Sequence, residues 1–172
     1  MTKKIIIGFI GVLILIQFII PSKNNSNDES KHISTIYPMS PELKSLITTT
    51  CNDCHSNHSE YPWYIRIQPV AWWMDHHIVE GKGRLNFSAF ASYPIAKQNH
   101  KLGDIVKFIE SKAMPLPSYS WFGLHKDAIL TADQRLMITR WASTQMDSIK
   151  ARYPADSLIY VRSAEDEEEE DD

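Results

Sequence analysis

The sequence contains only two cysteines among its 172 residues, and these two, Cys51 and Cys54, are three positions apart. Two cysteines so close together cannot form the disulfide framework of a domain of this size. No stretch is dense enough in lysine and arginine to predict binding of nucleic acid. These absences exclude a disulfide-stabilised scaffold and a nucleic-acid-binding protein, and the paired cysteines indicate a local chemical role.

Negative charge is concentrated at the C-terminus. Residues 165–172 are all acidic, and without these 8 the chain has 18 basic and 13 acidic side chains (21 minus 8), a net charge of about +5. A run of like charges usually stays solvated and disordered. We therefore predict an acidic, disordered tail over residues 151–172, with docking of the tail on a basic partner or on the body as the alternative.

The N-terminus carries a long apolar run, Ile5–Ile20, which only Gln17 interrupts and which Lys3 and Lys4 precede. A positive flank before an apolar run is typical of an export signal. The small residues of a cleavage site are absent, so we predict an uncleaved signal-anchor over residues 1–20, with a cleaved signal peptide as the alternative. Because the lysines should stay in the cytoplasm, the domain should lie in the periplasm, attached to the inner membrane through residues 5–20.

The rest of the chain predicts an all-α domain, since no strand-like alternation and no internal repeat occurs. Residues 21–35 are rich in polar residues and should form a flexible tether. Helix signals include an N-cap before a proline and a capping box. They predict a helix from Ser40 into Cys51, a helix over 70–81 ended by glycines, a short helix capped at Asn86, a helix over 94–112 and a final helix from Thr131.

Cys51, Cys54 and His55 form a C-x-x-C-H motif, which is the attachment signature of c-type haem. Two thiols on about one helical turn can add to the two vinyl groups of haem, and the adjacent imidazole then lies beneath the iron. Zinc bound by these residues and His58 is an alternative, but the spacing is too short for the usual finger. A redox-active C-x-x-C is another, although its usual βαβ context is missing.

The sixth iron ligand is predicted to be Met114, which lies in a loop made rigid by prolines between two helices. His76 or His77, in the helix over 70–81, is the alternative, and other candidates are His58, His100 and His125, or no ligand at all. Four other methionines are interpreted as core or surface residues: Met39, Met74, Met137 and Met146. Trp63 and Arg66 are the residues expected near the haem propionates.

Several segments resemble the bacterial haem-binding domain family that has a C-x-x-C-H motif. They are Cys51-Asn-Asp-Cys-His, Tyr61-Pro-Trp-Tyr, Pro69-Val-Ala-Trp, Gly81-Lys-Gly-Arg-Leu-Asn-Phe-Ser88 and Met114-Pro-Leu-Pro-Ser-Tyr119, with His125, Ala128, Leu130-Thr131 and Trp141. The resemblance covers residues 36–150 and implies a small cytochrome c-like domain around one haem c. It carries over Cys51, Cys54 and His55 as haem-binding residues, and Met114 less firmly.

The function predicted from these features is that of an exported, membrane-tethered c-type cytochrome that transfers single electrons. Such a protein is an electron carrier rather than an enzyme, and its partners should be redox proteins. The alternative is a haem enzyme or gas sensor with an open distal site, for which His76 or His77 would act as a distal acid–base group.

Overall fold

The structure, a computed structural model, describes residues 2–161, and within that range it is helical and contains no strand. The all-α prediction is therefore confirmed. The α-helices are α1 (Thr2–Ile16), α2 (Pro41–Thr50), α3 (Asn52–His55), α4 (Val70–Arg84), α5 (Ile95–Glu110) and α6 (Ala132–Arg152). The shorter 3₁₀ turns are η1 (Ile33–Thr35), η2 (Trp63–Arg66), η3 (Phe87–Ser92), η4 (Pro117–Gly123), η5 (Lys126–Ala128) and η6 (Ala155–Leu158).

The helix starts follow from local side-chain chemistry. Ser40 accepts a hydrogen bond from Leu43 N at 3.1 Å and so caps α2. Thr131 and Gln134 form the predicted reciprocal capping box at the start of α6. Both starts are thus confirmed at the expected residues. Each cap satisfies backbone N–H groups that have no partner inside the helix.

The predicted end of α4 is wrong, because the helix passes through Gly81 and continues to Arg84. Leu85 N donates to Gly81 O at 2.9 Å and closes the last turn. Glycine weakens a helix but does not terminate it when tertiary contacts favour continuation. Here the contact is with α3, as described below.

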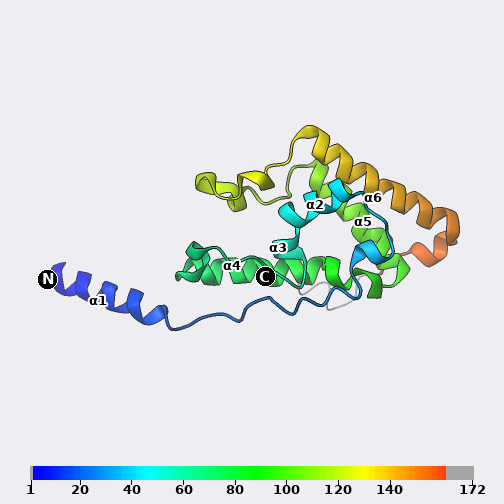
Figure 1. Cartoon of the computed structure of the whole chain (residues 1–172). Coiled ribbons are helices and arrows are strands. Elements are labelled where there is room, and N and C mark those ends of the chain that lie inside the picture. The colour runs from blue at the N-terminus through cyan, green and yellow to red at the C-terminus, as the bar shows by residue number, and fades with distance from the viewer. Residues whose placement is uncertain (1, 162–172) are drawn as a thin grey trace.

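The core lies where α5 and α6 pack side by side against α2 (Figure 1). Leu102 and Ile105 of α5 and Ile138 and Ile149 of α6 are all buried there. α2 contributes a buried stripe that includes Leu43 and Ile47. This three-helix core fixes the direction in which α2 delivers the chain to Cys51.

Residues 24–27 do not behave as the free tether that the sequence predicts. Asn24 donates through Nδ2 to Ser56 O at 2.9 Å and to Ser59 Oγ at 2.8 Å. Lys82 of α4 donates to Asn24 Oδ1 at 2.7 Å. The segment therefore connects the loop after α3 to α4, and we call it the strap. Polar side chains hold it through hydrogen bonds to residues distant in the sequence.

The sequence predicts a membrane anchor at the N-terminus and a disordered tail at the C-terminus. Among residues 2–161, no helix combines the length and the apolar composition that crossing a membrane requires. The anchor thus stays a prediction. The predicted tail begins too early, since α6 includes residues 151 and 152 and Tyr160 stacks on His100 with ring centroids 4.6 Å apart. Residues 162–172, which contain the acidic run, lie outside the described range.

Candidate functional site

The two cysteines lie where one helix ends and another begins. α2 ends at Thr50, and α3 is a single turn over residues 52–55. In this turn Cys54 N and His55 N donate to Cys51 O at 3.3 and 3.0 Å. One helical turn therefore carries both thiols and the imidazole that follows them, as the spacing of the motif predicts.

His55 is held through one edge of its ring. Its Nδ1 lies 2.8 Å from Gly81 O and 2.9 Å from Leu85 O, at the end of α4. Because both partners are acceptors, Nδ1 carries the proton and Nε2 keeps an unprotonated lone pair. Burial lowers the pKa of His55, although the two carbonyls oppose this shift, so the ring is neutral at neutral pH. Metal-ligating histidines are oriented by the same kind of hydrogen bond.

Gly81 allows α3 and α4 to come this close. A Cβ atom at this position would lie 2.6 Å from Cys54 O and 3.1 Å from Cys54 Cβ. Real Cβ atoms do not approach other atoms so closely, and the obstacle is backbone rather than a flexible side chain. Gly81, predicted to end the helix, instead lets α4 contact α3 closely enough for its carbonyl group to bond His55.

Two cavities meet at the motif. One has a volume of about 230 Å³ and lies between α3, α4 and the loop that follows α5. The other has a volume of about 170 Å³ and lies between α2, α5 and α6. The residues that line both are Thr50, Cys51, His55, Arg84, Met114 and Pro115. The predicted proximal histidine and the predicted distal methionine thus border the same space.

Neither thiol has the character of a redox-active cysteine. Burial raises the pKa of Cys51 to about 11, although a hydrogen bond with Thr50 opposes the shift. Burial, and then the negative charge of Asp53, raises the pKa of Cys54 to about 12. Thiol–disulfide exchange needs a thiolate, which is favoured by an electropositive setting. Two protonated, half-buried thiols do not favour that interpretation.

Met114 is fixed by backbone contacts on both sides. Met114 N donates to Phe108 O at 3.1 Å. Arg135 of α6 reaches into the loop, where its Nη1 donates to Met114 O at 3.0 Å and to Ile109 O at 2.9 Å. The loop is therefore held in place by a charged side chain as well as by its prolines, and Met114 stays on the wall of both cavities.

The structure separates the two neighbouring histidines of α4. His77 lines the larger cavity, and its Nδ1 lies 2.8 Å from Trp73 O, which leaves Nε2 as the atom without the proton. His76 does not line either cavity; its side chain is 53% exposed and pairs with Glu80 at 3.6 Å. Only His77 is therefore placed to reach a ligand in the cavity.

Asp53, one of the two variable residues of the motif, ties three segments together. Its Oδ2 accepts a hydrogen bond from Tyr119 Oη at 2.5 Å, and its Oδ1 accepts one from Glu60 N at 2.9 Å. Burial and the Asp53 carboxylate both raise the pKa of Tyr119, which remains a hydrogen-bond donor. Tyr119 in turn stacks on His125, with centroids 4.0 Å apart. The contact binds η4 to the motif helix.

Sequence reasoning missed Met74 and Arg84 as residues of the cavity walls. Met74 lines the larger cavity one turn before His77, so helical spacing from His77 could have indicated it. Arg84 lines both cavities. Trp63 and Arg66, predicted near the propionates, are both exposed and line neither cavity. The cations that the structure brings to these cavities are Arg84, which borders both, and Lys101, which borders the smaller one.

The zinc interpretation receives no support from the geometry. His58, its fourth ligand, is exposed and lies 3.2 Å from Glu60. Over the described part of the chain, no three or more histidine, cysteine or acidic side chains are grouped to hold a metal ion.

Residues 11–144 match a protein family that is described as the haem-binding domain. The chain belongs to this family. The matched range contains the whole site and begins inside α1, so it reaches further toward the N-terminus than the resemblance predicted from residues 36–150. No curated protein and no solved structure matches the chain.

The residues of this haem-binding domain fit the cofactor that its family implies. Haem needs a mostly apolar cavity and at least one nitrogen or sulfur ligand for the iron. Here His55 presents Nε2, and Met114, which lines the same two cavities, offers a thioether. Phe108, Ile109 and Trp141 make much of the smaller cavity apolar. Haem binding therefore agrees with both the family and the side chains present.

Proposed function

We propose that this haem-binding domain is an exported c-type cytochrome that carries single electrons at the outer face of the inner membrane. In this proposal haem c is attached covalently through Cys51 and Cys54, with His55 as the proximal ligand and Met114 as the distal ligand. Bound haem supplies a one-electron iron couple.

The hydrogen bond of His55 Nδ1 to Gly81 O is the observation that supports this most strongly. It sets the tautomer before any metal is present, because the only remaining ring nitrogen with a lone pair is Nε2. A hydrogen-bonded, oriented ring loses little freedom on ligation, and donation to a carbonyl raises its basicity. A histidine that served only in packing would not need two carbonyl acceptors at 2.8 and 2.9 Å.

The position of the two half-buried thiols supports covalent attachment. Thr50 Oγ1 lies 3.2 Å from Cys51 Sγ, and Cys51 and Cys54 both border the larger cavity. They are protonated and do not form a disulfide. Covalent attachment would retain a large apolar cofactor in a small domain whose larger cavity is walled in part by the single turn α3 and the loop after α5.

Met114 suits the distal position because its loop is fixed independently of any metal bond. A thioether binds ferric iron weakly, so the protein must hold the sulfur in place. Arg135 and Phe108 O do so through the backbone of the loop. Ligation by His and Met favours a higher reduction potential than ligation by two histidines, and a filled sixth position favours a carrier over an enzyme.

Export and membrane attachment rest on the N-terminal residues. Lys3 and Lys4 lie in the first turn of α1, ahead of its apolar residues, and no residue of α1 is buried. In the proposed arrangement the lysines stay in the cytoplasm and the haem domain faces the periplasm, where it exchanges electrons with partner redox proteins. The attachment raises the local concentration of such partners.

A haem enzyme or gas sensor with an open distal site is the second candidate, and the position of His77 favours it. His77 borders the larger cavity and could act as a distal acid–base group. Carbon monoxide distinguishes the two: rapid binding to the reduced protein indicates an open site, whereas slow binding indicates that Met114 must first dissociate.

The experiment that tests the main proposal is mass spectrometry of the chain matured in a host that exports and attaches haem c. The protein is extracted with acidic acetone, and the mass of the remaining chain is measured. We expect one haem to remain on the wild-type protein and on a His58→Ala control, and none on a Cys51→Ala/Cys54→Ala variant. Unmodified thiols in the wild-type protein would refute covalent attachment.

A further inference from the structure

One end of the domain exposes an unusual number of large apolar side chains. The exposed fractions are 73% for Trp63, 57% for Trp121 and 41% for Trp73. Single exposed apolar residues are ordinary, but a contiguous group indicates an interaction surface.

These side chains form one surface although they come from separate segments. Trp63 and Trp121 line the same hollow of about 440 Å³, together with Val70, Trp73 and Leu124. The hollow thus joins η2, the start of α4 and the η4–η5 segment. We call the surface formed by Trp63, Val70, Trp73 and Trp121 the tryptophan end.

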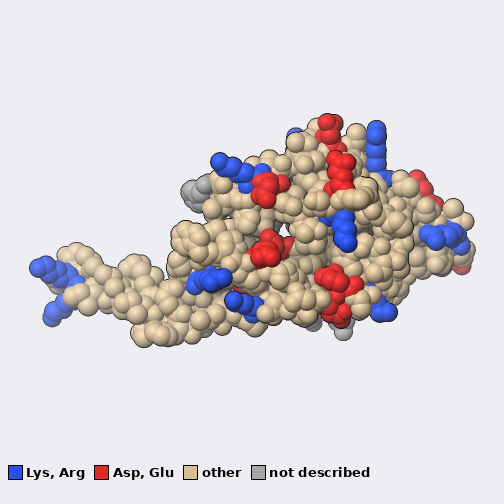
Figure 2. All heavy atoms as spheres, viewed as in Figure 1, with Lys and Arg blue, Asp and Glu red and all other residues tan. Residues whose placement is uncertain are grey.

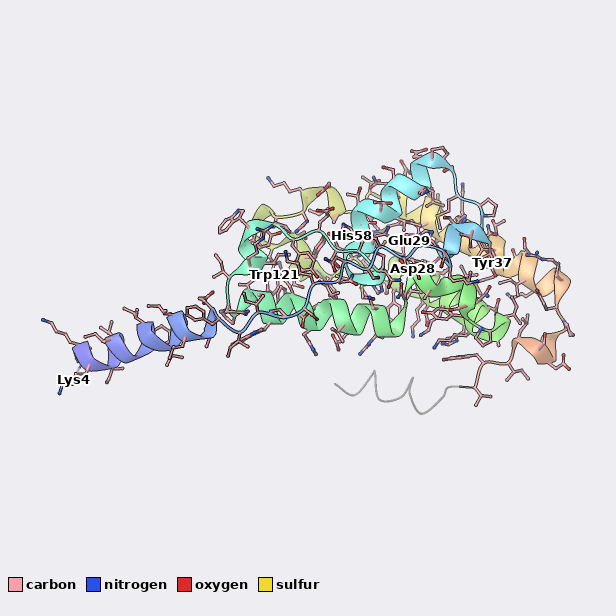
Figure 3. All side chains as sticks on the ribbon, turned by 60° about the horizontal axis from the view of Figure 1, so that its bottom comes forward. Lys4, Asp28, Glu29, Tyr37, His58 and Trp121 are labelled. Atoms are coloured by element: carbon pink, nitrogen blue, oxygen red, sulfur yellow. The ribbon has the colours of Figure 1, made fainter. Side chains whose placement is uncertain are left out.

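The apolar helix α1 leaves the domain at this same end. The side chain of Gln17, just after α1, accepts a hydrogen bond from Gln68 N at 2.9 Å and donates one to Gln68 O at 3.3 Å. Gln68 Nε2 and Trp72 Nε1 both donate to Ile19 O, at 2.7 and 2.9 Å. Figure 3 shows Lys4 at the far end of α1 and Trp121 at the end of the domain toward α1.

The character of α1 indicates what covers this end. The apolar side chains of α1 point in all directions, with exposed fractions such as 69% for Ile7, 63% for Phe9 and 56% for Val12. A helix that is apolar on every side needs an apolar surrounding on every side. A one-sided groove on a protein partner or a second copy would cover only part of it, whereas lipid surrounds it.

The length of α1 also indicates that the end of the domain next to it lies close to a membrane. Its 15 residues span about 22 Å at about 1.5 Å per residue, and the hydrocarbon core of a bilayer is about 30 Å thick. A short apolar helix draws the adjoining surface toward the membrane. That surface is the tryptophan end, and tryptophan is the residue most typical of the membrane–water interface.

The charges beside this end are compatible with a lipid surface. Lys23 Nζ lies 5.8 Å from the centre of the Tyr61 ring, and Arg66 Nη2 donates to Tyr61 O at 3.4 Å. Figure 2 shows basic and few acidic side chains where α1 joins the domain on the face in view. Basic side chains at this level would meet anionic lipid headgroups.

We propose that the tryptophan end of the domain rests on the surface of a lipid bilayer, with Trp63 and Trp121 in the interface and α1 inserted. The inference deepens the membrane attachment under the proposed function and rests on it. It adds that the domain is held in one orientation, with the hollow beside the haem cavity facing the membrane.

The test uses the full-length, haem-loaded protein in vesicles of phosphatidylethanolamine and phosphatidylglycerol. A spin label is placed at Trp63→Cys, Trp121→Cys, Val12→Cys and, as the control on the far end of α6, Lys150→Cys. The wild-type protein treated with label gives the background from Cys51 and Cys54, and the haem absorption spectrum confirms that each variant is folded.

The measurement is the collision rate of each label with dissolved oxygen, which concentrates in lipid, relative to a water-soluble nickel chelate. We expect this ratio at residues 63 and 121 to be several-fold higher than at residue 150, and highest at residue 12. A lipid-like ratio at residue 12 with water-like ratios at 63 and 121 would overturn the docking and leave the anchor intact. Water-like ratios at all three would overturn both.

Discussion

The imidazole Nδ1 of His55 and the carbonyl oxygen of Gly81 lie 2.8 Å apart, and the residue that supplies this carbonyl has no side chain. These two facts are connected. A side chain at residue 81 would collide with Cys54 O, so the only residue that permits the hydrogen bond at this distance between α3 and α4 is glycine.

Gly81→Ala is therefore expected to destabilise the protein. The new Cβ would lie 2.6 Å from Cys54 O and must push α3 and α4 apart, with a cost of about 1–3 kcal/mol for overpacking. We expect a lower urea midpoint and, in haem-loaded protein, a changed absorption spectrum. Gly103→Ala is the matched control: its Cβ meets only Met146 Cε, at 3.5 Å. A helical alanine there should leave stability unchanged or raise it by up to about 1 kcal/mol.

Replacing Met114 tests the distal ligand. Met114→Ala should lower the reduction potential of the haem-loaded protein and accelerate binding of carbon monoxide, because the sixth position loses its sulfur. Met74→Ala is the control, since Met74 borders the same larger cavity. If the Met74 variant changes the spectrum and the Met114 variant does not, the assignment to Met114 is wrong.

Arg135 should affect the sixth ligand position of the iron, because it holds the loop that contains Met114. Arg135→Ala removes donors to Met114 O and Ile109 O, each worth about 1.5–3 kcal/mol when a charged group takes part. The loop then holds the sulfur less firmly, so added imidazole should bind the ferric haem roughly tenfold or more tightly, as about 1.4 kcal/mol corresponds to a factor of ten. Arg140→Ala, an exposed arginine of the same helix, should leave imidazole binding unchanged.

The hydrogen bond between Asp53 and Tyr119 should contribute to the attachment of η4. Tyr119→Phe removes the donor and leaves the carboxylate with one fewer partner, at a cost of about 1–3 kcal/mol. Urea denaturation of haem-loaded protein measures the loss. Tyr153→Phe, on a tyrosine that is 42% exposed, is the control and should be nearly neutral. Equal midpoints for the two variants would contradict a structural role for this bond.

Stability should fall as the pH falls from neutral, in part through His32. Burial lowers the pKa of His32, against the opposing effect of Glu29, and Nδ1 accepts a hydrogen bond from Ser34 N at 3.1 Å. The unfolded chain therefore binds this proton more readily than the folded chain, so the stabilisation is complete above the ordinary pKa of about 6.5 and is lost as the pH falls through the folded value.

The measurement is the free energy of unfolding at about pH 8 and about pH 5, in haem-loaded protein. His32→Asn should reduce the difference between the two values, because it removes the shifted group. His58→Asn, at a histidine whose side chain is 46% exposed, should retain the wild-type difference. An undiminished difference in the His32 variant would show that other groups cause the dependence.

The sequence predicts those features whose causes are local. The cap of Ser40 on Leu43 N and the box of Thr131 and Gln134 depend on residues three positions apart. The placement of Cys51 and His55 on a single turn depends only on the spacing of the motif. Each of these could be read directly from neighbouring residues.

Other features could not be predicted because their partners are distant in the sequence. Gly81 is 26 residues from His55, and Arg135 is 21 residues from Met114. The choice between His76 and His77 depends on which face α4 turns toward the cavity, and helical spacing does not specify that face by itself. The polar composition around Asn24 predicted a flexible tether, but the Asn24 side chain forms hydrogen bonds with Ser56 O and with Lys82.

The strap through Asn24 has a mechanical consequence. Gln17 and Ile19 are bonded to the start of α4, and Asn24 is bonded both to Lys82 near its end and to the loop after His55. A force applied to the N-terminal helix is thus transmitted to both helices that hold the thiols and the imidazole. Bending of that helix relative to the domain would therefore pull on the two carbonyl groups that hold the His55 ring.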